Sequence, residues 1–264
     1  KFPVEDMRDF LDILPRLNAK DAGRINPDFY AITERLKLSG EAAGLWIDGF
    51  FAWPRELMGL EGLSIALYDD SGLIHAINEQ HLEFVKDYTA IILKEIQIDY
   101  AVFFEDMAYK NAPLISPDHF REFMMPYYKE LVNWLRCKGI KRIIIDSDGD
   151  VRKLVPLFKE AGADALSPCE INAGSTPEEL WNICPDITLI GGVDKRSLIA
   201  GKDAIDVEIE KMRSRLKTGR YIPAVDHRVP PDVSMENYKY YVERKKSLLR
   251  EFSKNNADQG VCYG

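Results

Sequence analysis

Residues 142–148 read Arg-Ile-Ile-Ile-Asp-Ser-Asp, a short run of apolar, β-branched residues that stops in acids. Three isoleucines in succession are typical of a strand buried on both faces, as in a parallel sheet. Similar runs ending in Gly, Pro or acidic residues recur along the chain, and the candidate strands are 45–53, 100–106, 142–148, 163–170, 187–194 and 221–227. Amphipathic stretches separate them, and this alternation predicts an α/β fold with a parallel sheet.

The number of candidate strands bears on the architecture. Six strands do not close an eight-stranded barrel, and an open parallel sheet leaves unpaired edges that natural proteins avoid. The first run begins only at residue 45, after helix-like, charged sequence. We therefore expect a single domain over residues 1–264, a (β/α)8 TIM-barrel-like fold that lacks its first two βα units in this chain. The alternative is a doubly wound sheet whose edges are covered by helices.

Composition excludes several classes of function. The chain has 35 Lys and Arg against 43 Asp and Glu, a net charge of -8, and no segment gathers the basic patch that nucleic acid requires. The 4 cysteines lack CxxC spacing, which argues against a disulfide framework or a thiolate zinc site and fits a reducing cytoplasm. No apolar run approaches the roughly 18 residues of a membrane span. We expect a soluble, cytoplasmic protein, and a homo-oligomer stays open.

Functional side chains gather at the ends of five of these runs. They are Glu105 and Asp106, Asp146 and Asp148, Cys169 and Glu170, Asp194 and Lys195, and Asp226 and His227. In a parallel barrel the carboxyl ends of the strands converge on one mouth. Carboxylates crowded there must be protonated, paired with a lysine or histidine, or bound to a cation. The alternative for each residue alone is a helix cap, but five coincidences favour a site.

Two of these sites, the Asp146 and Asp148 pair and His227, lead to more specific hypotheses. Asp146 and Asp148 point the same way if the strand persists that far, so they make a pair for a cation or a polar substrate group. A calcium loop is excluded, because the position of its closing glutamate holds Leu157. His227 follows Asp226, where a neighbouring carboxylate can orient the ring. It is the best single candidate, since the other histidines fall in predicted helices.

The C-terminal third carries the motif of a known family. Residues 226–237, Asp-His-Arg-Val-Pro-Pro-Asp-Val-Ser-Met-Glu-Asn, resemble the closing motif of the uroporphyrinogen decarboxylase superfamily, where a strand-end histidine precedes a hydrophobic residue, a proline and a Glu-Asn pair. Residues 190–195 resemble its strand-loop that ends in Asp, and residues 114–117 resemble the start of its middle helix. The resemblance implies a (β/α)8 barrel whose two opening units lie upstream of this chain.

Two branches of that superfamily imply different chemistry. The decarboxylases remove carboxyl groups from a tetrapyrrole and grip it with arginines of an N-terminal segment not found here, and a surplus of acids would repel such a substrate. The other branch resembles corrinoid-dependent methyltransferases, in which zinc held by His and Cys activates a thiol. Here Asp146-Ser147-Asp148 replaces the His-x-Cys of that motif. We expect an enzyme that moves a methyl group between a small methylated substrate and a corrinoid on a partner protein.

The resemblance implies roles for the strand-end residues. His227 or Glu170 would protonate a leaving oxygen or nitrogen. Asp146 and Asp148 would bind substrate or metal, Lys195 would be the counter-charge, and Asp194 completes the catalytic set. The substrate-binding set is Glu105, Asp106, Cys169 and Asp226. A divalent metal such as zinc stays open, with the candidate ligands Asp146, Asp148, Glu170 and His227. Two alternatives also stay open: a uroporphyrinogen decarboxylase, and a non-catalytic barrel that binds a corrinoid or porphyrin.

Overall fold

The computed structural model describes residues 2–258, and all of the predicted strand runs contain a strand. One sheet holds β1 (Gly44–Asp48), β2 (Tyr100–Phe104), β5 (Arg142–Asp146), β6 (Ala165–Cys169), β7 (Thr188–Val193) and β8 (Tyr221–Val225). Neighbouring strands are parallel throughout. A separate antiparallel hairpin pairs β3 (Ala108–Tyr109) with β4 (Ala112–Pro113).

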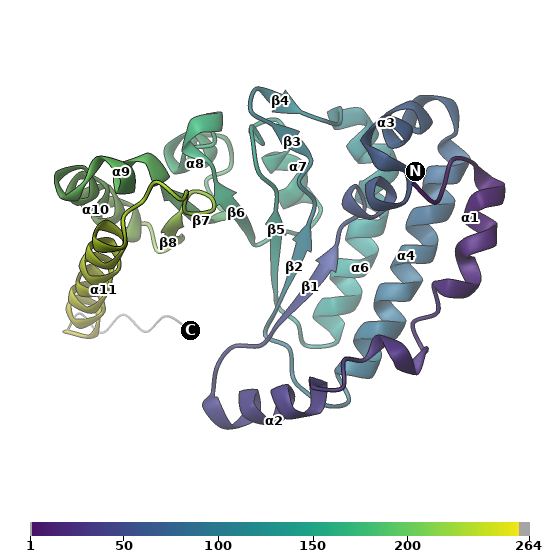
Figure 1. Cartoon of the computed structure of the whole chain (residues 1–264), viewed down its shortest axis with the longest axis horizontal. Coiled ribbons are helices and arrows are strands. Elements are labelled where there is room, and N and C mark those ends of the chain that lie inside the picture. The colour runs from purple at the N-terminus through teal and green to yellow at the C-terminus, as the bar shows by residue number, and fades with distance from the viewer. Residues whose placement is uncertain (1, 259–264) are drawn as a thin grey trace.

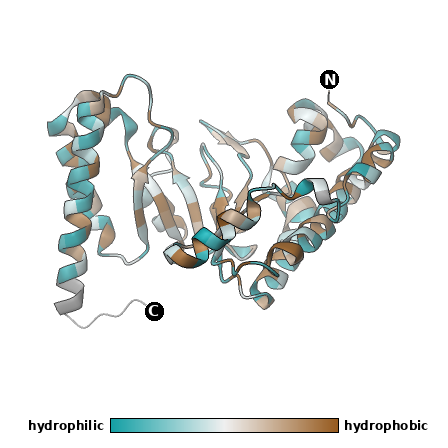
Figure 2. Cartoon of the chain, turned by 60° about the horizontal axis from the view of Figure 1, so that its bottom comes forward, coloured by the Kyte–Doolittle hydropathy of each residue, from teal (hydrophilic) through white to brown (hydrophobic). Residues whose placement is uncertain are grey.

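Helices occupy the chain between the strands. They are α1 (Met7–Ile13), α2 (Phe29–Ser39), α3 (Ala52–Asp69), α4 (Ser71–Ile92), α5 (Pro117–His119), α6 (Met125–Cys137), α7 (Val155–Glu160), α8 (Pro177–Ile183), α9 (Lys195–Ala200), α10 (Lys202–Leu216) and α11 (Met235–Asp258). Figure 1 shows α3, α4 and α6 gathered beside β1 and β2, and α8 to α11 at the opposite end beside β7 and β8. Hydrophobic and hydrophilic stretches alternate along the helices in Figure 2, as in helices that pack one side on a sheet. Within residues 2–258 no helix is long and apolar enough to cross a membrane.

The strand order decides between the two expected architectures. A doubly wound sheet reverses its direction of growth at a switch point. Here the order is β1-β2-β5-β6-β7-β8, so each new strand of the sheet is added on the same side as the one before. That order is the arc of a singly wound barrel, and the α/β, TIM-barrel-like prediction is confirmed. Among the described residues, β1 and β8 are the edges of the sheet.

The first predicted strand is shorter than expected. The apolar run 45–53 predicted one strand, but β1 ends at Asp48 and α3 begins at Ala52. The chain leaves the sheet because the peptide N–H groups of Phe50, Phe51 and Ala52 donate to the carboxylate of Glu105. Asp48 therefore stands at a strand end and not inside a strand.

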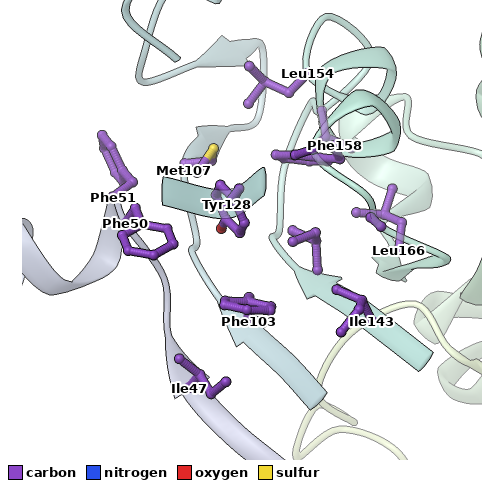
Figure 3. Packing of buried hydrophobic residues seen from close by; sticks show 14 of the residues in the cluster. Ile47, Phe50, Phe51, Phe103, Met107, Tyr128, Ile143, Leu154, Phe158 and Leu166 are labelled. Atoms are coloured by element: carbon purple, nitrogen blue, oxygen red, sulfur yellow. The ribbon is translucent and has the colours of Figure 1, made fainter. Parts of the chain in front are cut away.

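One face of the sheet packs on the helices. Ile143 and Ile145 of β5 are buried completely, together with Phe103 of β2 and Tyr128 of α6. Figure 3 shows this core between the strands and the helices, with Ile143, Phe103 and Tyr128 labelled. Aromatic packing contributes here, since the rings of Phe103 and Tyr128 meet edge to face with centroids 5.2 Å apart. Burial of this face holds the sheet to its helices.

The second face of the sheet is open in the described residues. Ile144, between the two buried isoleucines, is only half-buried, so the expectation of a strand buried on both faces is wrong here. At the edges of the sheet, Trp46 and Ile222 are 60% and 53% exposed. A cavity of about 460 Å³ lies against Ile144, Ile190 and Ile222. This is the concave face that forms the interior in a closed barrel.

The loop after β5 is fixed by a glycine. Gly149 has a φ of +82°, and a Cβ added there would lie 2.6 Å from the carbonyl oxygen of Ala108. The N–H of Asp150 donates to the carbonyl of Tyr109 at 2.9 Å, which seats the loop on the hairpin of β3 and β4. The position of Asp148, the preceding residue, depends on this close approach.

Replacement of Gly149 by Ala tests this constraint. We expect Gly149→Ala to lower the free energy of unfolding by about 2 kcal/mol or more, because a left-handed backbone and a backbone clash act together. Gly139→Ala is the matched control, since Gly139 also has a positive φ but nothing lies within 4 Å of its added Cβ. It should lose about 1 kcal/mol. Urea denaturation measures both, and equal losses would show that the clash is relieved at no cost.

Candidate active site

The strand-end residues converge at one end of the sheet. Asp48 ends β1, Asp146 ends β5 and Cys169 ends β6. The other predicted residues lie just after a strand, and they are Glu105, Asp106, Asp148, Glu170, Asp194, Lys195, Asp226 and His227. Because parallel strands present their carboxyl ends at one edge, residues far apart in the sequence become neighbours. Six of them, here called the mouth cluster, are Asp106, Asp146, Asp148, Glu170, Lys195 and His227.

A histidine–carboxylate pair lies within the mouth cluster. The Nε2 atom of His227 lies 2.8 Å from Oδ2 of Asp148, and each side chain is 32% exposed. The pair joins the loop after β8 to the loop after β5. A carboxylate at this distance orients the imidazole. The pair is accessible enough to meet a ligand and ordered enough to direct a proton.

A second ion pair lies beside the first. Nζ of Lys195 is 3.2 Å from Oε1 of Glu170, and both side chains are about one-fifth exposed, at 19% and 21%. The other carboxylate oxygen of Glu170 accepts the N–H of Gly149 at 3.1 Å. This pair therefore connects the loops after β5, β6 and β7. Of the three outcomes expected for crowded strand-end carboxylates, Glu170 shows pairing with a lysine.

Two further carboxyls in the mouth cluster have a perturbed pKa. Burial, reinforced by the negative charges of Asp148 and Asp106, raises the pKa of Asp146 to about 6, against the opposing effect of His227. Burial also raises the pKa of Asp106. A carboxyl whose pKa is raised by burial keeps its proton to a higher pH than an ordinary carboxyl does.

Glu105 is not a substrate-binding residue, contrary to expectation. It is fully buried at 0% exposure. Its carboxylate accepts the N–H groups of Phe50, Phe51 and Ala52 at 2.9, 3.0 and 2.9 Å, and the hydroxyl of Tyr128. Burial raises its pKa to about 7, while these donors act in the opposite direction. Glu105 binds the start of α3 to the end of β2.

Asp226 and Cys169 are also removed from the predicted substrate-binding set. Asp226 is 0% exposed, and its carboxylate accepts the N–H groups of Ile171 at 3.1 Å and Lys195 at 3.0 Å. It ties together the loops after β6, β7 and β8. The thiol of Cys169 is buried in the core, and burial raises its pKa to about 12. A substrate cannot reach either side chain.

Asp194 caps a helix instead of facing the mouth cluster. Its carboxylate accepts the N–H of Arg196 at 2.9 Å at the start of α9 and pairs with the Arg196 guanidinium at 2.6 Å. The bonded guanidinium lowers the pKa of Asp194. For this residue the cap interpretation describes the geometry, because both carboxylate oxygens are bonded to Arg196.

The predicted metal ligands do not fit a metal centre in this arrangement. Within the described part of the chain, no three His, Cys, Asp or Glu side chains are grouped so as to hold a metal ion. His227 is bonded to Asp148, and Glu170 is bonded to Lys195. Oxygen donors with a single imidazole also differ from the thiolate and imidazole sets that zinc prefers.

Two residues near the mouth cluster were not foreseen. Asp48 has a pKa raised by burial and by Glu56, and it was hidden by the overextended first strand. Arg55 lies in the first turn of α3, and its Nη1 donates to the carbonyl oxygen of Asp106 at 2.6 Å. The carboxyl-end position of Asp48 was a usable signal, whereas nothing in the local sequence relates Arg55 to a strand 51 residues away.

The role of Glu105 is open to a direct test. We expect Glu105→Ala to lower the free energy of unfolding by about 3 kcal/mol, because three buried N–H groups and a tyrosine hydroxyl lose their acceptor. Tyr128→Phe removes one donor and should cost about 1 kcal/mol. Chemical denaturation of both variants provides the comparison. A stable Glu105→Ala protein would contradict the capping role.

Comparisons with known proteins agree with this geometry. Residues 55–248 match the family model described as uroporphyrinogen decarboxylase (URO-D). A uroporphyrinogen decarboxylase of Campylobacter fetus is 26% identical over 192 residues, which cover 71% of this chain and 52% of that protein. A methylated-thiol–coenzyme M methyltransferase of Methanosarcina mazei is 24% identical over 196 residues, covering 74% of this chain and 50% of that protein.

A solved structure is similar in fold. A methyltransferase from Methanosarcina mazei superposes with a TM-score of 0.64 at 18% identity, over 84% of this chain and 64% of that one. The chain spans about half the length of the two curated relatives, 52% and 50%. The likeness confirms the barrel-like fold, and it leaves the reaction to be argued from the mouth cluster.

Proposed function

This chain belongs to the uroporphyrinogen decarboxylase family, and we propose that it acts as a methyltransferase, moving a methyl group between a small methylated substrate and a corrinoid carried by a partner protein. A methyltransferase relative and a methyltransferase of similar fold support this reading. The observation that carries it is the contact of 2.8 Å between His227 and Asp148. It offers an acid to the group that loses the methyl.

The chemistry requires such an acid. Removal of CH3+ from a methyl ether or an uncharged methylamine leaves a negative charge on oxygen or nitrogen, and that atom must take up a proton. The corrinoid supplies the nucleophile that accepts the methyl group. His227 donates the proton, and Asp148 orients the ring through the contact of 2.8 Å. Asp146 and Asp106, with raised pKa values, bind polar groups of the substrate.

The charge of the mouth cluster favours this reaction over decarboxylation. Four carboxyls, Asp106, Asp146, Asp148 and Glu170, stand against Lys195 and His227. A tetrapyrrole that bears several carboxylates would be repelled by this surplus of acid. Thiol activation by zinc is not part of the proposal, because the residues present do not fit a zinc centre.

Different methyl donors separate the role of His227 from a structural one. We expect His227→Ala to lower kcat/KM roughly 100-fold or more for methyl ethers, whose leaving oxygen needs a proton. A quaternary methylammonium donor that gives up its methyl group becomes a neutral amine and needs no proton. For such donors kcat/KM should therefore fall several-fold at most. The measurement is methyl transfer to a Co(I) corrinoid by the full-length protein.

The control variant is His119→Ala, which lies on α5 outside the mouth cluster and should leave all rates unchanged. Equal losses for every donor would argue against proton donation by His227. Absence of transfer from any donor, with release of carbon dioxide from uroporphyrinogen, would establish a decarboxylase instead. Binding of a corrinoid or porphyrin without either reaction would indicate the non-catalytic barrel.

A further inference from the structure

Asp106 has an unusual backbone conformation. Its φ is +46°, the one positive φ at a non-glycine residue in the described part of the chain. Residues with a Cβ adopt this left-handed region at a cost, although Asp and Asn tolerate it better than most. Such strain persists only when the surroundings enforce it, and it concentrates at functional sites.

Arg55 makes the side-chain contact to the carbonyl group of this turn. Its Nη1 donates to the carbonyl oxygen of Asp106 at 2.6 Å and lies 3.8 Å from the carboxylate oxygen Oδ2. The side chain is only 15% exposed. Its guanidinium carbon lies 5.6 Å from the ring centroid of Phe51 and 5.9 Å from that of Phe104, so aromatic faces hold it in place. Arg55 thus bridges the start of α3 to the end of β2.

The carboxyl of Asp106 lies close enough to the rest of the mouth cluster to interact with its charges. Burial is the largest cause of its raised pKa, and the charges of Asp148 and Glu170 act in the same direction. Arg55 and His227 act in the opposite direction. Asp106 is therefore the residue through which Arg55, on α3, is connected to both ion pairs of the mouth cluster.

We propose that Arg55 is a positioning residue: it holds Asp106 in the left-handed conformation and thereby presents the Asp106 carboxylate to the Asp148–His227 pair. The inference rests on the proposed function in one respect, that the Asp148–His227 pair is the acid of the reaction. The strand-end turn, the guanidinium and the carboxylate form one unit. Loss of either Arg55 or Asp106 releases the other from its role.

The first test concerns the backbone and needs no activity. At a left-handed position Gly is preferred to Ala, so Asp106→Gly should have a higher melting temperature than Asp106→Ala, with Asp106→Asn closest to wild type. Asp118 is the matched control, since it is exposed and lies in the first turn of α5. At Asp118 the order of melting temperatures should reverse, with Asp118→Ala higher than Asp118→Gly. The same order at both positions would overturn the strained conformation.

The second test follows the ionisation of Asp106. Carboxyl carbon NMR of wild type and Arg55→Gln should show the pKa of Asp106 moving upward in the variant, because the guanidinium that lowers it is gone. Arg55→Lys keeps the positive charge and should move it less. Arg35→Gln, an exposed change on α2, should leave it unaltered. An unchanged pKa of Asp106 in the Arg55→Gln variant would contradict the proposal.

The third test uses methyl transfer. Arg55→Gln and Asp106→Asn should each lower kcat/KM roughly tenfold, and the double variant should be no slower than the slower single one, because Arg55 acts through Asp106. Losses that multiply would mean that Arg55 acts independently, and the proposal would fail while the methyltransferase function stood. If no transfer is found, the melting and NMR results still decide the role of Arg55.

Discussion

Two buried carboxylates hold the mouth of this sheet together. Glu105 binds three successive N–H groups at the start of α3, and Asp226 binds one N–H in each of the loops after β6 and β7. Neither carboxylate is exposed, so their hydrogen bonds are not shared with water and each loop has one arrangement that satisfies them. These two anchors fix the loops after β6 and β7 and the start of α3, and the glycine at 149 fixes the loop after β5.

The two buried carboxylates also position Arg55 and residues of the mouth cluster. Glu105 fixes the turn from which Arg55 reaches Asp106, while Asp226 fixes the residue after Glu170 and the backbone of Lys195. The side chains beside the anchors differ from them in exposure: His227 and Asp148 are each 32% exposed. Burial thus separates the carboxylates that shape the loops from those that can meet a ligand. Residues adjacent in sequence, such as Asp226 and His227, have different roles for this reason.

Membership of the family limits the reactions to be considered but does not identify the reaction of this chain. Relatives include decarboxylases and a methyltransferase. Among residues 2–258, the mouth of this sheet is rich in acids, has one histidine and has no grouping of side chains that could hold a metal ion. A proton donor for a leaving oxygen or nitrogen fits that composition better than a grip on a polyanion.

The sequence by itself determined the strands, their parallel arrangement and the end of the sheet at which polar residues gather, because apolar runs that stop in acids are local patterns. It also paired His227 and Lys195 with carboxylates in general terms. It did not determine which carboxylates are buried acceptors of backbone N–H groups and which belong to the mouth cluster. Whether Glu105 or Asp106 faces the mouth depends on one residue of strand alternation and on a turn whose φ is +46°.

The end of the first strand also could not be predicted from the local sequence. Its apolar run continues to Trp53, and only the carboxylate of Glu105, more than 50 residues away, turns the last residues of that run into a helix. Arg55 enters the site through that turn, so no local pattern could have revealed it. Tertiary structure decided these roles because the donors and acceptors that satisfy a buried carboxylate come from distant segments of the chain.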